Sequence, residues 1–359
     1  MNSLCLFDDS LADRFQPLTL TRPAGDLRVG IFTIAEKWRH YFKTDNLRYN
    51  SKPWFSGIFP SERADNINSE LWINSRYLPD RKLAEAIRKL ELNSGLTDGS
   101  HTIVARLSSA ASKKIDSFHD LSLNEIINYE EYEGAIPLKR LWELFLRNGE
   151  EIISDLDFIM ETKNFLDALP DSITTSNREQ IFIHQQAEIE PGSIFIADEG
   201  PIYIGESAHI QAGSLIRGPV AICDDAVIKM GAKIYGKTTI GPVCKVGGEV
   251  NNCIFHSYSN KGHDGFTGNS LFGQWCNLGA DTNTSNLKNN YSTIRLTDFS
   301  SGDKIESGQQ FIGTIMGDHS KTSINTMLNT GTVCGVSPSS FHPSAGWEAL
   351  WKFTGLIKL

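Results

Sequence analysis

The stretch that decides the fold runs from residue 204 to residue 250 and reads IGESAHIQAGSLIRGPVAICDDAVIKMGAKIYGKTTIGPVCKVGGEV. An aliphatic residue recurs at every sixth position, and a small or branched residue follows each of them four positions later. The aliphatic positions are Ile204, Ile210, Ile216, Ile222, Ile228, Ile234, Ile240 and Val246. The small or branched positions are Ala208, Ser214, Val220, Ala226, Ala232, Thr238, Cys244 and Val250. A period of six fits neither an α-helix, with a period of about 3.6, nor a single strand, with a period of about 2.

This period is typical of a coil of three short parallel strands, each of which turns one aliphatic side chain inward. Such coils stack about 4.8 Å apart and satisfy one another's backbone hydrogen bonds. Glycine is concentrated at the expected corners, where a tight turn favours a residue without Cβ. These glycines are Gly205, Gly213, Gly231, Gly241 and Gly247. With an upstream repeat at Ile183 and Ile189, the pattern predicts a left-handed parallel β-helix of hexapeptide repeats over residues 179–345.

The six-residue frame is interrupted first at 251–265, a segment that contains His256 and His263. The frame is expected to resume at Phe266, followed by Phe272 and Leu278, and later at Met316, Thr322, Leu328 and Cys334. We therefore expect 251–265 to be a loop inserted into the solenoid. Loops on a rigid scaffold often carry function.

A second interruption falls at 284–310. Within it, Ile294 and Leu296 alternate with polar residues, and Ser300-Ser301-Gly302-Asp303 supplies a turn. This pattern predicts a protruding hairpin.

The first half of the chain differs from the second in composition, because residues 1–180 hold only 7 of the 30 glycines. The expected elements are a strand at 4–7, a helix after the capping box of Thr33 and Glu36, a helix after Asp80 with Leu83, Ile87 and Leu90 facing inward, a strand at 102–105 and a helix at 138–146. Alternating strands and helices predict an α/β domain with a doubly wound sheet over 1–178. A polar boundary at 162–180 precedes the solenoid, and 346–359 form a C-terminal tail.

Charge and cysteine usage exclude several classes of protein. The net charge of −9 argues against nucleic-acid or membrane-surface partners, which require basic patches. No window approaches 18 consecutive apolar residues, and the first residues lack the basic and apolar regions of a signal peptide. The six cysteines show no paired metal-ligand spacing, so we expect small, buried, reduced thiols in a cytoplasmic protein.

Several short stretches carry a resemblance to a known family. In the first half they are LFDD at 6–9, PLTLTRP at 17–23, DLR at 26–28 and EKW at 36–38; in the second half they are GAKIYG at 231–236, NKGHDG at 260–265 and MGDHSKT at 316–322. With these motifs the chain resembles the bifunctional N-acetylglucosamine-1-phosphate uridyltransferase/glucosamine-1-phosphate acetyltransferases, as a divergent branch with a shortened N-terminal domain. The resemblance implies a reduced, nucleotidyltransferase-like Rossmann-type sheet in that domain.

For the solenoid, the resemblance implies that His263 is the catalytic base of acetyl transfer. Like the family's histidine, it is followed by an aromatic residue and a glycine, Phe266 and Gly268. A neutral imidazole suits this role, because its pKa near 6.5 lets it take a proton from an ammonium group. The residues implied to bind the amino sugar and the acyl thioester are Lys233, Tyr235, Lys261, Phe266, Asn277, Ala280 and Asn286. The family's sugar-phosphate arginine falls on Tyr235, with Lys233 as a possible substitute.

For the N-terminal domain, the resemblance implies nucleotide contacts from Arg14, Arg22 and Arg28. The family's glycine pair is replaced by Leu11-Ala12-Asp13, so fewer backbone N–H groups can approach phosphates. The counterpart of the family's metal-binding aspartate, Ile73-Asn74-Ser75-Arg76, lacks a carboxylate. We assign no metal ligands, and Mg²⁺ is expected only if this domain is active.

The resulting hypothesis is acetyl transfer from acetyl-CoA to glucosamine-1-phosphate, with uridylyl transfer from UTP to the product as a second reaction. One alternative is an acyltransferase with a degenerate N-terminal domain, and another is a non-catalytic sugar-nucleotide-binding scaffold. A third is a zinc hydratase that uses His256, His263 and His319, although their spacing gives no close pair. The resemblance also implies a homotrimer with the acyl donor between the coils of two subunits.

Overall fold

The computed structural model describes residues 3–63, 68–115, 127–161 and 164–338. The chain divides into two compact units. Unit 1 comprises 1–15, 21–27 and 32–141, and unit 2 comprises 16–20, 28–31 and 142–359. Residues 142–178, which the sequence placed with the N-terminal domain, thus belong to the unit that holds the solenoid. The expected tail at 346–359 lies outside the described residues.

Unit 1 is built on a six-stranded mixed sheet with the order β2-β1-β3-β6-β5-β7. Its strands are β1 (Ser3–Phe7), β2 (Leu47–Asn50), β3 (Ser69–Asn74), β5 (Ser94–Thr97), β6 (Thr102–Ser108) and β7 (Asn128–Glu131). Strand β1 pairs in parallel with β2 and β3, whereas β6 runs antiparallel to β3 and β5. The domain is therefore mixed α/β as expected, but only part of its sheet has the parallel pairing of a doubly wound fold. A separate short pair joins β4 (Tyr77–Leu78) to β8 (Ile136–Pro137).

The helices of unit 1 begin where the sequence indicated. Helix α1 (Ile34–Phe42) has the complete capping box of Thr33 and Glu36. Asp80 caps α2 (Arg81–Lys89), whose Leu83 and Ile87 are buried. A short α3 (Ser109–Ser112) packs against β3 and β6. The short 3-10 helices are η1 (Ser10–Phe15), η2 (Leu18–Leu20), η3 (Ala24–Asp26) and η4 (Pro53–Phe55) in the first part of the chain, and η5 (Arg178–Gln180) before the solenoid.

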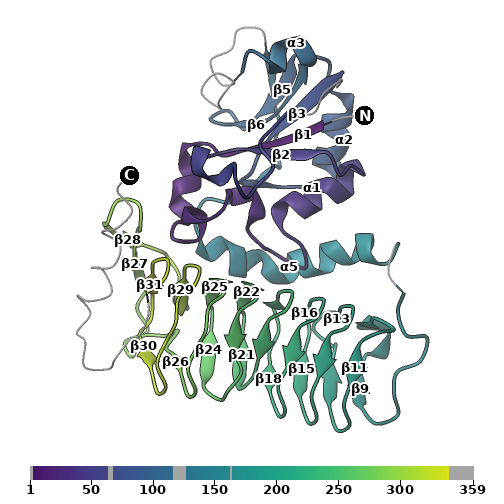
Figure 1. Cartoon of the computed structure of the whole chain (residues 1–359), viewed down its shortest axis with the longest axis vertical. Coiled ribbons are helices and arrows are strands. Elements are labelled where there is room, and N and C mark those ends of the chain that lie inside the picture. The colour runs from purple at the N-terminus through teal and green to yellow at the C-terminus, as the bar shows by residue number, and fades with distance from the viewer. Residues whose placement is uncertain (1–2, 64–67, 116–126, 162–163, 339–359) are drawn as a thin grey trace. The chain divides into compact units, whose positions relative to one another are not determined.

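In unit 2 the strands cycle through three parallel faces, stacked coil on coil (Figure 1). The first face holds β10 (Ile181–Ile183), β13 (Ile202–Ile204), β16 (Val220–Ile222), β19 (Thr238–Ile240), β22 (Ile254–Ser257), β25 (Leu271–Gln274), β29 (Thr314–Met316) and β31 (Thr332–Cys334). The second face holds β11 (Glu188–Ile189), β14 (His209–Ile210), β17 (Val227–Ile228), β20 (Lys245–Val246) and β23 (Asn260–Lys261). The third face holds β9 (Thr174–Ser176), β12 (Ile194–Ile196), β15 (Leu215–Arg217), β18 (Lys233–Ile234), β21 (Glu249–Asn251) and β24 (Phe266–Gly268), and β26 (Asn283–Thr284) pairs with β30 (Met327–Leu328).

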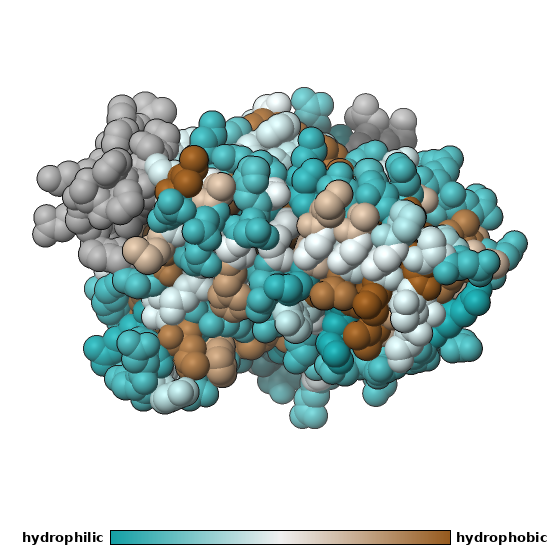
Figure 2. All heavy atoms as spheres, turned by 90° about the horizontal axis from the view of Figure 1, so that it is seen from below, coloured by the Kyte–Doolittle hydropathy of each residue, from teal (hydrophilic) through white to brown (hydrophobic). Residues whose placement is uncertain are grey.

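The predicted six-residue frame forms the core of the solenoid. All sixteen periodic positions from Ile204 to Val250 are at most 1% exposed. Consecutive parallel strands with this core are consistent with a β-helix, and its left-handedness stays a prediction. Some apolar side chains remain exposed on the solenoid, and on the face shown in Figure 2 brown groups are separated by teal ones. They include Leu215, Met230, Val243, Ile324 and Met327.

The prediction of an inserted loop at 251–265 is wrong, because this segment contributes strands to all three faces of the solenoid. Val246 pairs in register with Lys261, 15 positions later rather than 18. The coil is therefore shortened, which breaks the frame without a protrusion. The inward frame also resumes one residue later than expected, since Thr267 is fully buried while Phe266 lies on the outside.

The second interruption does hold the predicted hairpin. Strands β27 (Arg295–Thr297) and β28 (Lys304–Glu306) pair antiparallel, with Leu296 opposite Ile305. The solenoid also starts earlier than expected, because β9 already pairs with β12 inside the stretch we took as a boundary.

Helix α5 (Trp142–Ile159) starts later and runs further than the helix expected at 138–146. It packs on the first face of the solenoid against β16, β19 and β22. The Asn148 amide donates to the Lys237 carbonyl at 2.8 Å and to the Thr239 hydroxyl at 3.0 Å. Among the described residues, no helix is long and apolar enough to cross a membrane. All six cysteines are free and buried, as predicted.

Candidate functional site

The chain path in unit 1 creates a crevice at one edge of its sheet. From β1 the chain goes to β2 on one side and then to β3 on the other side. At such a switch point the connections leave in opposite directions, and ligands of α/β proteins bind beside the carboxyl ends of the strands. A cavity of about 360 Å³ lies here, lined by Phe7, Asp9, Ser10, Asn74, Thr97, Gly99, Ser100, His101, Thr102 and Tyr129.

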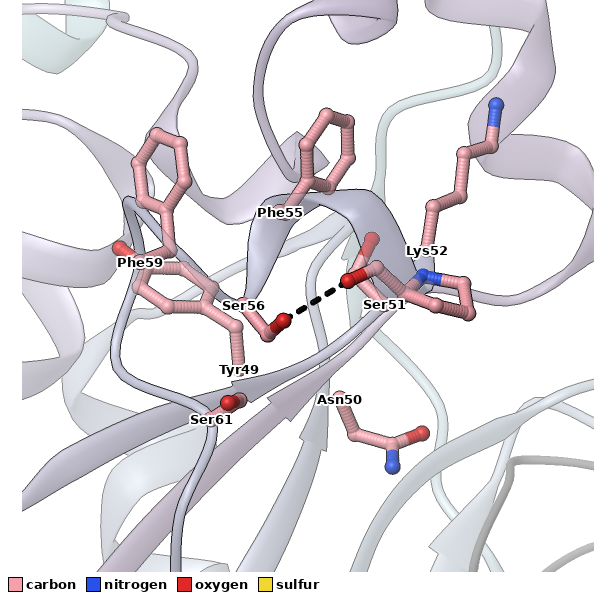
Figure 3. Close-up of a pocket in the computed structure, with 9 residues that line it drawn as sticks. Tyr49, Asn50, Ser51, Lys52, Phe55, Ser56, Phe59 and Ser61 are labelled. Atoms are coloured by element: carbon pink, nitrogen blue, oxygen red, sulfur yellow. Dashed lines mark hydrogen bonds between the residues drawn. The ribbon is translucent and has the colours of Figure 1, made fainter. Parts of the chain in front are cut away.

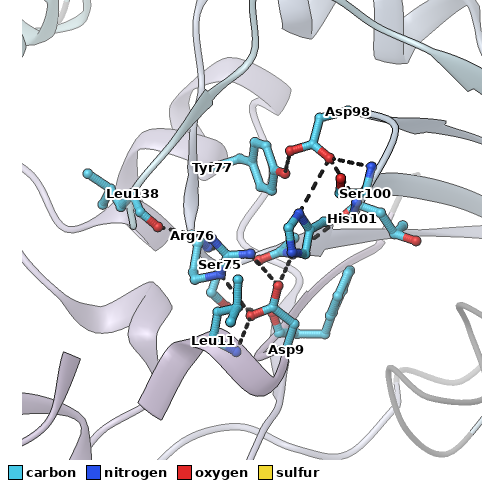
Figure 4. A network of polar contacts seen from close by, with 12 residues as sticks. Asp9, Leu11, Ser75, Arg76, Tyr77, Asp98, Ser100, His101 and Leu138 are labelled. Carbon is cyan, nitrogen blue, oxygen red and sulfur yellow. Dashed lines mark hydrogen bonds and ion pairs between the residues drawn. The ribbon is translucent and has the colours of Figure 1, made fainter. Parts of the chain in front are cut away.

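A buried ion pair forms the floor of this switch-point cavity (Figure 4). The Arg76 guanidinium donates from Nε to Asp9 Oδ1 at 2.7 Å, contacts Oδ2 with a second nitrogen, and donates to the Leu138 carbonyl at 3.0 Å. The Asn74 amide donates to Asp9 Oδ2 at 2.9 Å. Burial alone would raise the pKa of Asp9, but the hydrogen bonds and charge of Arg76, with the Asn74 amide, outweigh it and hold the pKa below its usual value.

The β5–β6 hairpin forms the opposite wall of the cavity. Asp98 accepts hydrogen bonds from the Tyr77 hydroxyl at 2.6 Å and from the backbone N–H groups of Ser100 and His101 at 2.9 and 2.7 Å. Burial opposes ionisation of Asp98, yet these hydrogen bonds keep its pKa below the usual value. His101 Nδ1 lies 3.4 Å from Asp98. Asp98 therefore orients His101, the one imidazole that lines this cavity.

The two aspartates after β1 are held by hydrogen bonds to neighbouring segments. Asp8 accepts hydrogen bonds from the Ala24 N–H at 3.2 Å and from the Ser51 hydroxyl. Burial raises the pKa of Asp8 despite these bonds. The Asp9 carboxylate is engaged by Arg76, Asn74 and the Leu11 N–H. Mg²⁺ is usually held by one or two carboxylates together with substrate phosphates and water. Asp9 is the one carboxylate among the described lining residues and is already engaged, so these residues do not fit a Mg²⁺ ion.

A smaller cavity of about 110 Å³ lies at the end of β2, among Tyr49, Asn50, Ser51, Lys52, Pro53, Phe55, Ser56, Phe59 and Ser61. Figure 3 shows the rings of Tyr49 and Phe59 on one side and Lys52 on the other. Ser56 donates to the Pro53 carbonyl at 2.9 Å, which closes the turn. This volume is below the range of typical ligand pockets, roughly 300–1,000 Å³. The switch-point cavity is therefore the better candidate site in unit 1.

The structure gives the three predicted nucleotide-binding arginines different surroundings. Arg14 lies half-buried in η1. Arg22 is buried and pairs with Asp26 at 2.9 Å. Arg28 belongs to unit 2, where its Nε donates to the His256 carbonyl at 3.0 Å. None of them lines the switch-point cavity, and nucleotide contact by these residues stays a prediction.

Two of the predicted solenoid residues share the outside of the third face. The strand register aligns Lys233 with Glu249, and Glu249 with Phe266. Lys233 and Phe266 therefore lie two coils apart, at roughly twice the 4.8 Å spacing between strands.

Phe266 and Asn286 meet over Gly268. A Cβ built on Gly268 would lie 2.5 Å from the Asn286 amide nitrogen and 2.7 Å from the Phe266 ring. The glycine of the resemblance motif is thus required for this close approach, since any side chain would push the ring and the amide apart. Asn286 also lines a groove together with Tyr235.

His263 and Lys261 lie at the corner between the second and third faces. His263 is exposed, whereas Lys261 is 1% exposed and occupies an inward-facing position. The Lys261 ammonium donates to the Gly247 and His263 carbonyls, both at 3.0 Å. Lys261 therefore ties the His263 turn to the preceding coil, and it does not face an exposed substrate site.

Burial lowers the pKa of Lys261 to about 8, against the attraction of Asp264 and Asp281. Between pH 8 and 10.5 the unfolded chain then binds a proton that the folded chain does not, so the free energy of unfolding rises with pH there. We expect Lys261→Met to remove this rise, which amounts to at most about 1.4 kcal/mol per pH unit. Urea unfolding at pH 7.5, 8.5 and 9.5 measures it, with the exposed Lys233→Met as control. Equal pH slopes for wild type and Lys261→Met would contradict the burial argument.

The remaining predicted residues are dispersed. Asn277 is exposed on the second face, where its side chain accepts from the Asn260 amide at 2.8 Å. Ala280 lies at the corner one coil beyond the His263 turn, where the Asp281 N–H donates to the Asp264 carbonyl at 3.1 Å. Both are near His263 in the coil order but outside the groove of Tyr235 and Asn286.

The histidines of the zinc alternative do not gather within the chain. His256 is buried with Nδ1 3.0 Å from the Ser257 hydroxyl, and His319 stacks on Trp275 with ring centroids 6.3 Å apart. In the described part of the chain, the one cluster of three potential metal ligands is Glu188, Glu190 and His209. That cluster lies on the second face, away from these histidines.

Asp9, Asn74, Arg76 and His101 were not predicted as site residues. Asn74 is the last residue of β3, and Asp9 and Arg76 lie two residues beyond β1 and β3, so polar residues at the carboxyl ends of adjacent parallel strands were the available signal. No comparable signal exists for His101, because only the β5–β6 pairing brings its turn to this edge.

Comparison with known proteins identifies the class of the N-terminal part. A family model described as sugar nucleotidyl transferase matches residues 4–164. The match covers unit 1 but less than half of the 359 residues. The N-terminal domain is therefore nucleotidyltransferase-like, and at this coarse level the match supports a transferase of sugar-nucleotide biosynthesis. No curated protein matches the chain.

Proposed function

We propose that the chain makes a nucleotide sugar in two steps, acetylation of an amino-sugar 1-phosphate and uridylyl transfer to the product. The sugar nucleotidyl transferase match over a domain with a cavity at its switch point carries this proposal. Glucosamine-1-phosphate, acetyl-CoA and UTP are the substrates that the family resemblance implies.

For uridylyl transfer, we place the reacting groups in the switch-point cavity. A phosphate oxygen of the sugar phosphate attacks the α-phosphorus of UTP, the bond to the β-phosphate oxygen breaks, and pyrophosphate leaves. His101, the Asn74 amide and the hydroxyls of Ser100 and Thr102 line the cavity and are the available polar groups. The ion pair of Asp9 and Arg76 keeps the floor rigid, which favours positioning of the reactants.

For acetyl transfer, we place the base at His263. Its imidazole takes a proton from the sugar ammonium, and the freed amine attacks the thioester carbonyl of acetyl-CoA. A C–N bond forms, the C–S bond breaks, and the amine nitrogen loses its second proton. One of the two protons goes to the departing thiolate and the other is released to solvent. Phe266 and Asn286 both lie over Gly268, and this arrangement supports a prearranged acceptor surface on the third face.

The exposure of His263 also supports a homotrimer. A general base on an open corner lacks the exclusion of water that strengthens transfer sites. A second copy of the chain, packed on this corner, would enclose the thioester between two subunits.

A coupled assay with glucosamine-1-phosphate, acetyl-CoA and Mg·UTP tests both halves, with thiol release and pyrophosphate release read separately. We expect His263→Ala to lower thiol release by about 10²–10⁴-fold, the usual contribution of a general base, and to leave pyrophosphate release from N-acetylglucosamine-1-phosphate unchanged. His101→Ala is expected to do the reverse, with a loss of about tenfold or more in pyrophosphate release.

Each variant is the matched control of the other. Thiol release without pyrophosphate release in the wild type would favour the acyltransferase with a degenerate N-terminal domain. Neither product, despite binding of the sugar nucleotide, would favour the scaffold. Full thiol release by His263→Ala would remove the base assignment.

A further inference from the structure

The carboxylate of the switch-point cavity has no oxygen left for a metal ion. Asp9 is the one carboxylate among the described lining residues, and each of its oxygens already accepts two hydrogen bonds. Oδ1 accepts from the Leu11 N–H at 3.0 Å and from Arg76 Nε at 2.7 Å, and Oδ2 accepts from the Asn74 amide at 2.9 Å and from a second nitrogen of Arg76. A Mg²⁺ ion would have to displace these donors before it could reach the carboxylate.

Arg76 already brings a positive charge to this place. Its side chain is 1% exposed, and its guanidinium is fixed by both Asp9 oxygens and by the Leu138 carbonyl at 3.0 Å. The guanidinium carbon also lies 5.8 Å from the centre of the Tyr77 ring. A guanidinium does not lose its charge in a protein, so a divalent cation beside it would meet a permanent repulsion, which burial strengthens.

The last residue of β3 is engaged in the same network. The Asn74 amide donates to Asp9 and, at 3.1 Å, to the Thr102 carbonyl, and its oxygen accepts from the Arg76 N–H at 3.1 Å. Each polar atom of Asn74 thus has a partner within the protein. The side chain at the end of this strand therefore connects β1 and β3 to β6 and does not present an oxygen to a cation.

The opposite wall of the cavity offers groups that can bind a phosphate directly. His101 is the one basic side chain among the described lining residues, and 38% of it is exposed. The hydroxyls of Ser10 and Ser100 line the cavity with it. Imidazole N–H and hydroxyl groups donate hydrogen bonds to phosphate oxygens, and such bonds to a charged acceptor are stronger than those between neutral groups.

The turn that carries His101 is held in place before any ligand binds. Asp98 accepts from the Tyr77 hydroxyl and from the N–H groups of Ser100 and His101, and the Thr97 hydroxyl donates to the His101 carbonyl at 2.9 Å. Figure 4 shows this turn on one side of the network and the ion pair of the floor on the other. The imidazole is therefore directed into the cavity by the backbone of its own turn.

We propose that the switch-point cavity binds the phosphates of its nucleotide without a divalent metal ion, with His101 in contact with the phosphate oxygens and Arg76 as the fixed cation of the floor. The inference rests on the proposed function in one respect, since it takes a uridine nucleotide as the ligand. It replaces the expectation that Mg²⁺ accompanies an active N-terminal domain.

Calorimetric titration of the full-length protein with UTP tests the proposal, once in the presence of EDTA and once with excess MgCl₂. We expect the same dissociation constant in both conditions, because the cation takes no part in binding. His101→Gln and His101→Ala should weaken binding about tenfold or more in both conditions, the usual effect of losing a hydrogen bond to a charged group. His319→Gln changes an exposed histidine of the solenoid; it is the matched control and should bind as wild type does.

UTP binding that is lost in EDTA and restored by MgCl₂ would overturn the proposal. It would also be overturned if the wild type binds no UTP in either condition, or if both His101 variants bind as tightly as the wild type. Thermal unfolding checks that the variants are folded, and the comparison of EDTA with MgCl₂ needs no variant.

The failure of this inference differs from the failure of the proposed transfer reaction. UTP binding in EDTA with no pyrophosphate release in any condition would refute uridylyl transfer and support metal-free binding. Pyrophosphate release that requires Mg²⁺, together with no binding in EDTA, would support uridylyl transfer and overturn metal-free binding.

Discussion

Replacing Arg76 by alanine is expected to lower the free energy of unfolding of unit 1 by about 3–5 kcal/mol, the usual cost of leaving a buried charge without its partner. The Arg76 and Asp9 side chains are 1% and 7% exposed. Removal of the guanidinium strands the Asp9 carboxylate and also leaves the Leu138 carbonyl without this donor. Urea unfolding at pH 7, followed by tryptophan fluorescence, measures the loss.

The Arg76 effect should depend on pH in a defined direction. Since the folded-state pKa of Asp9 is depressed, its stabilisation is present above the unfolded pKa of about 3.9 and is lost as pH falls through the folded value. In Arg76→Ala the burial of Asp9 is no longer opposed by the guanidinium, so the pKa of Asp9 rises. The difference from wild type should therefore shrink as the pH is lowered toward 4.

An exposed ion pair provides the control for this experiment. Arg295 and Glu306 pair on the hairpin with side chains 66% and 56% exposed, and Arg295→Ala should cost less than about 1 kcal/mol. The double variant Asp9→Asn, Arg76→Met should recover part of the loss, because no unpaired charge remains buried. A loss below 1 kcal/mol for Arg76→Ala would show that water or rearrangement replaces the guanidinium.

The second large loss of stability is expected for Gly30→Ala, which should lower the free energy of unfolding by about 2–5 kcal/mol. Gly30 has φ +78°, and a Cβ there would lie 2.4 Å from Asp155 Oδ2 and 2.8 Å from the Glu151 carbonyl of α5. The segment cannot shift to relieve the clash, because the Gly30 N–H donates to Asn148 at 2.7 Å and its carbonyl accepts from Thr239 at 2.9 Å. Thermal and urea unfolding of the solenoid unit measure the change.

Gly213→Ala is the matched control for Gly30→Ala. Gly213 has a similar φ of +70°, but nothing lies within 4 Å of the position of its Cβ. Gly213→Ala should therefore lower the free energy of unfolding only by the cost of placing alanine at a positive φ, about 1 kcal/mol. Equal decreases in the free energy of unfolding of the two variants would contradict the prediction, because they would show that α5 moves away from the new Cβ at little cost.

The solenoid was the part of the fold that the sequence determined best. Each periodic residue from Ile204 to Val250 packs in the core because one coil of three strands repeats its inward positions every six residues. The same local logic located α1 and α2, whose capping residues Thr33 and Asp80 act within one turn of the helix. Periodic core positions and helix caps can be recognised from the sequence because the residues that produce them lie only a few positions apart.

The shortened coil shows where local periodicity stops being informative. At 251–265 the backbone ladder continues while the number of residues per coil falls, so Lys261 takes an inward position that Val246 held one coil earlier. Strand pairing between coils decides this register, and residues 15 positions apart carry no local sign of it. The inward lysine is then stabilised by the Gly247 and His263 carbonyls, which only the folded corner brings together.

The candidate sites divide in the same way. The sequence by itself determined the solenoid core, the α/β character of unit 1 and the place of His263 in its motif. Only the tertiary structure brought Arg76 to Asp9 across two strands, paired Gly30 with Asn148 of α5, and aligned Asn252, Asn269 and Asn286 into a groove. The physical reason is distance along the chain: caps and periodic positions act between near neighbours, whereas ion pairs and cavities form between side chains that only folding makes adjacent.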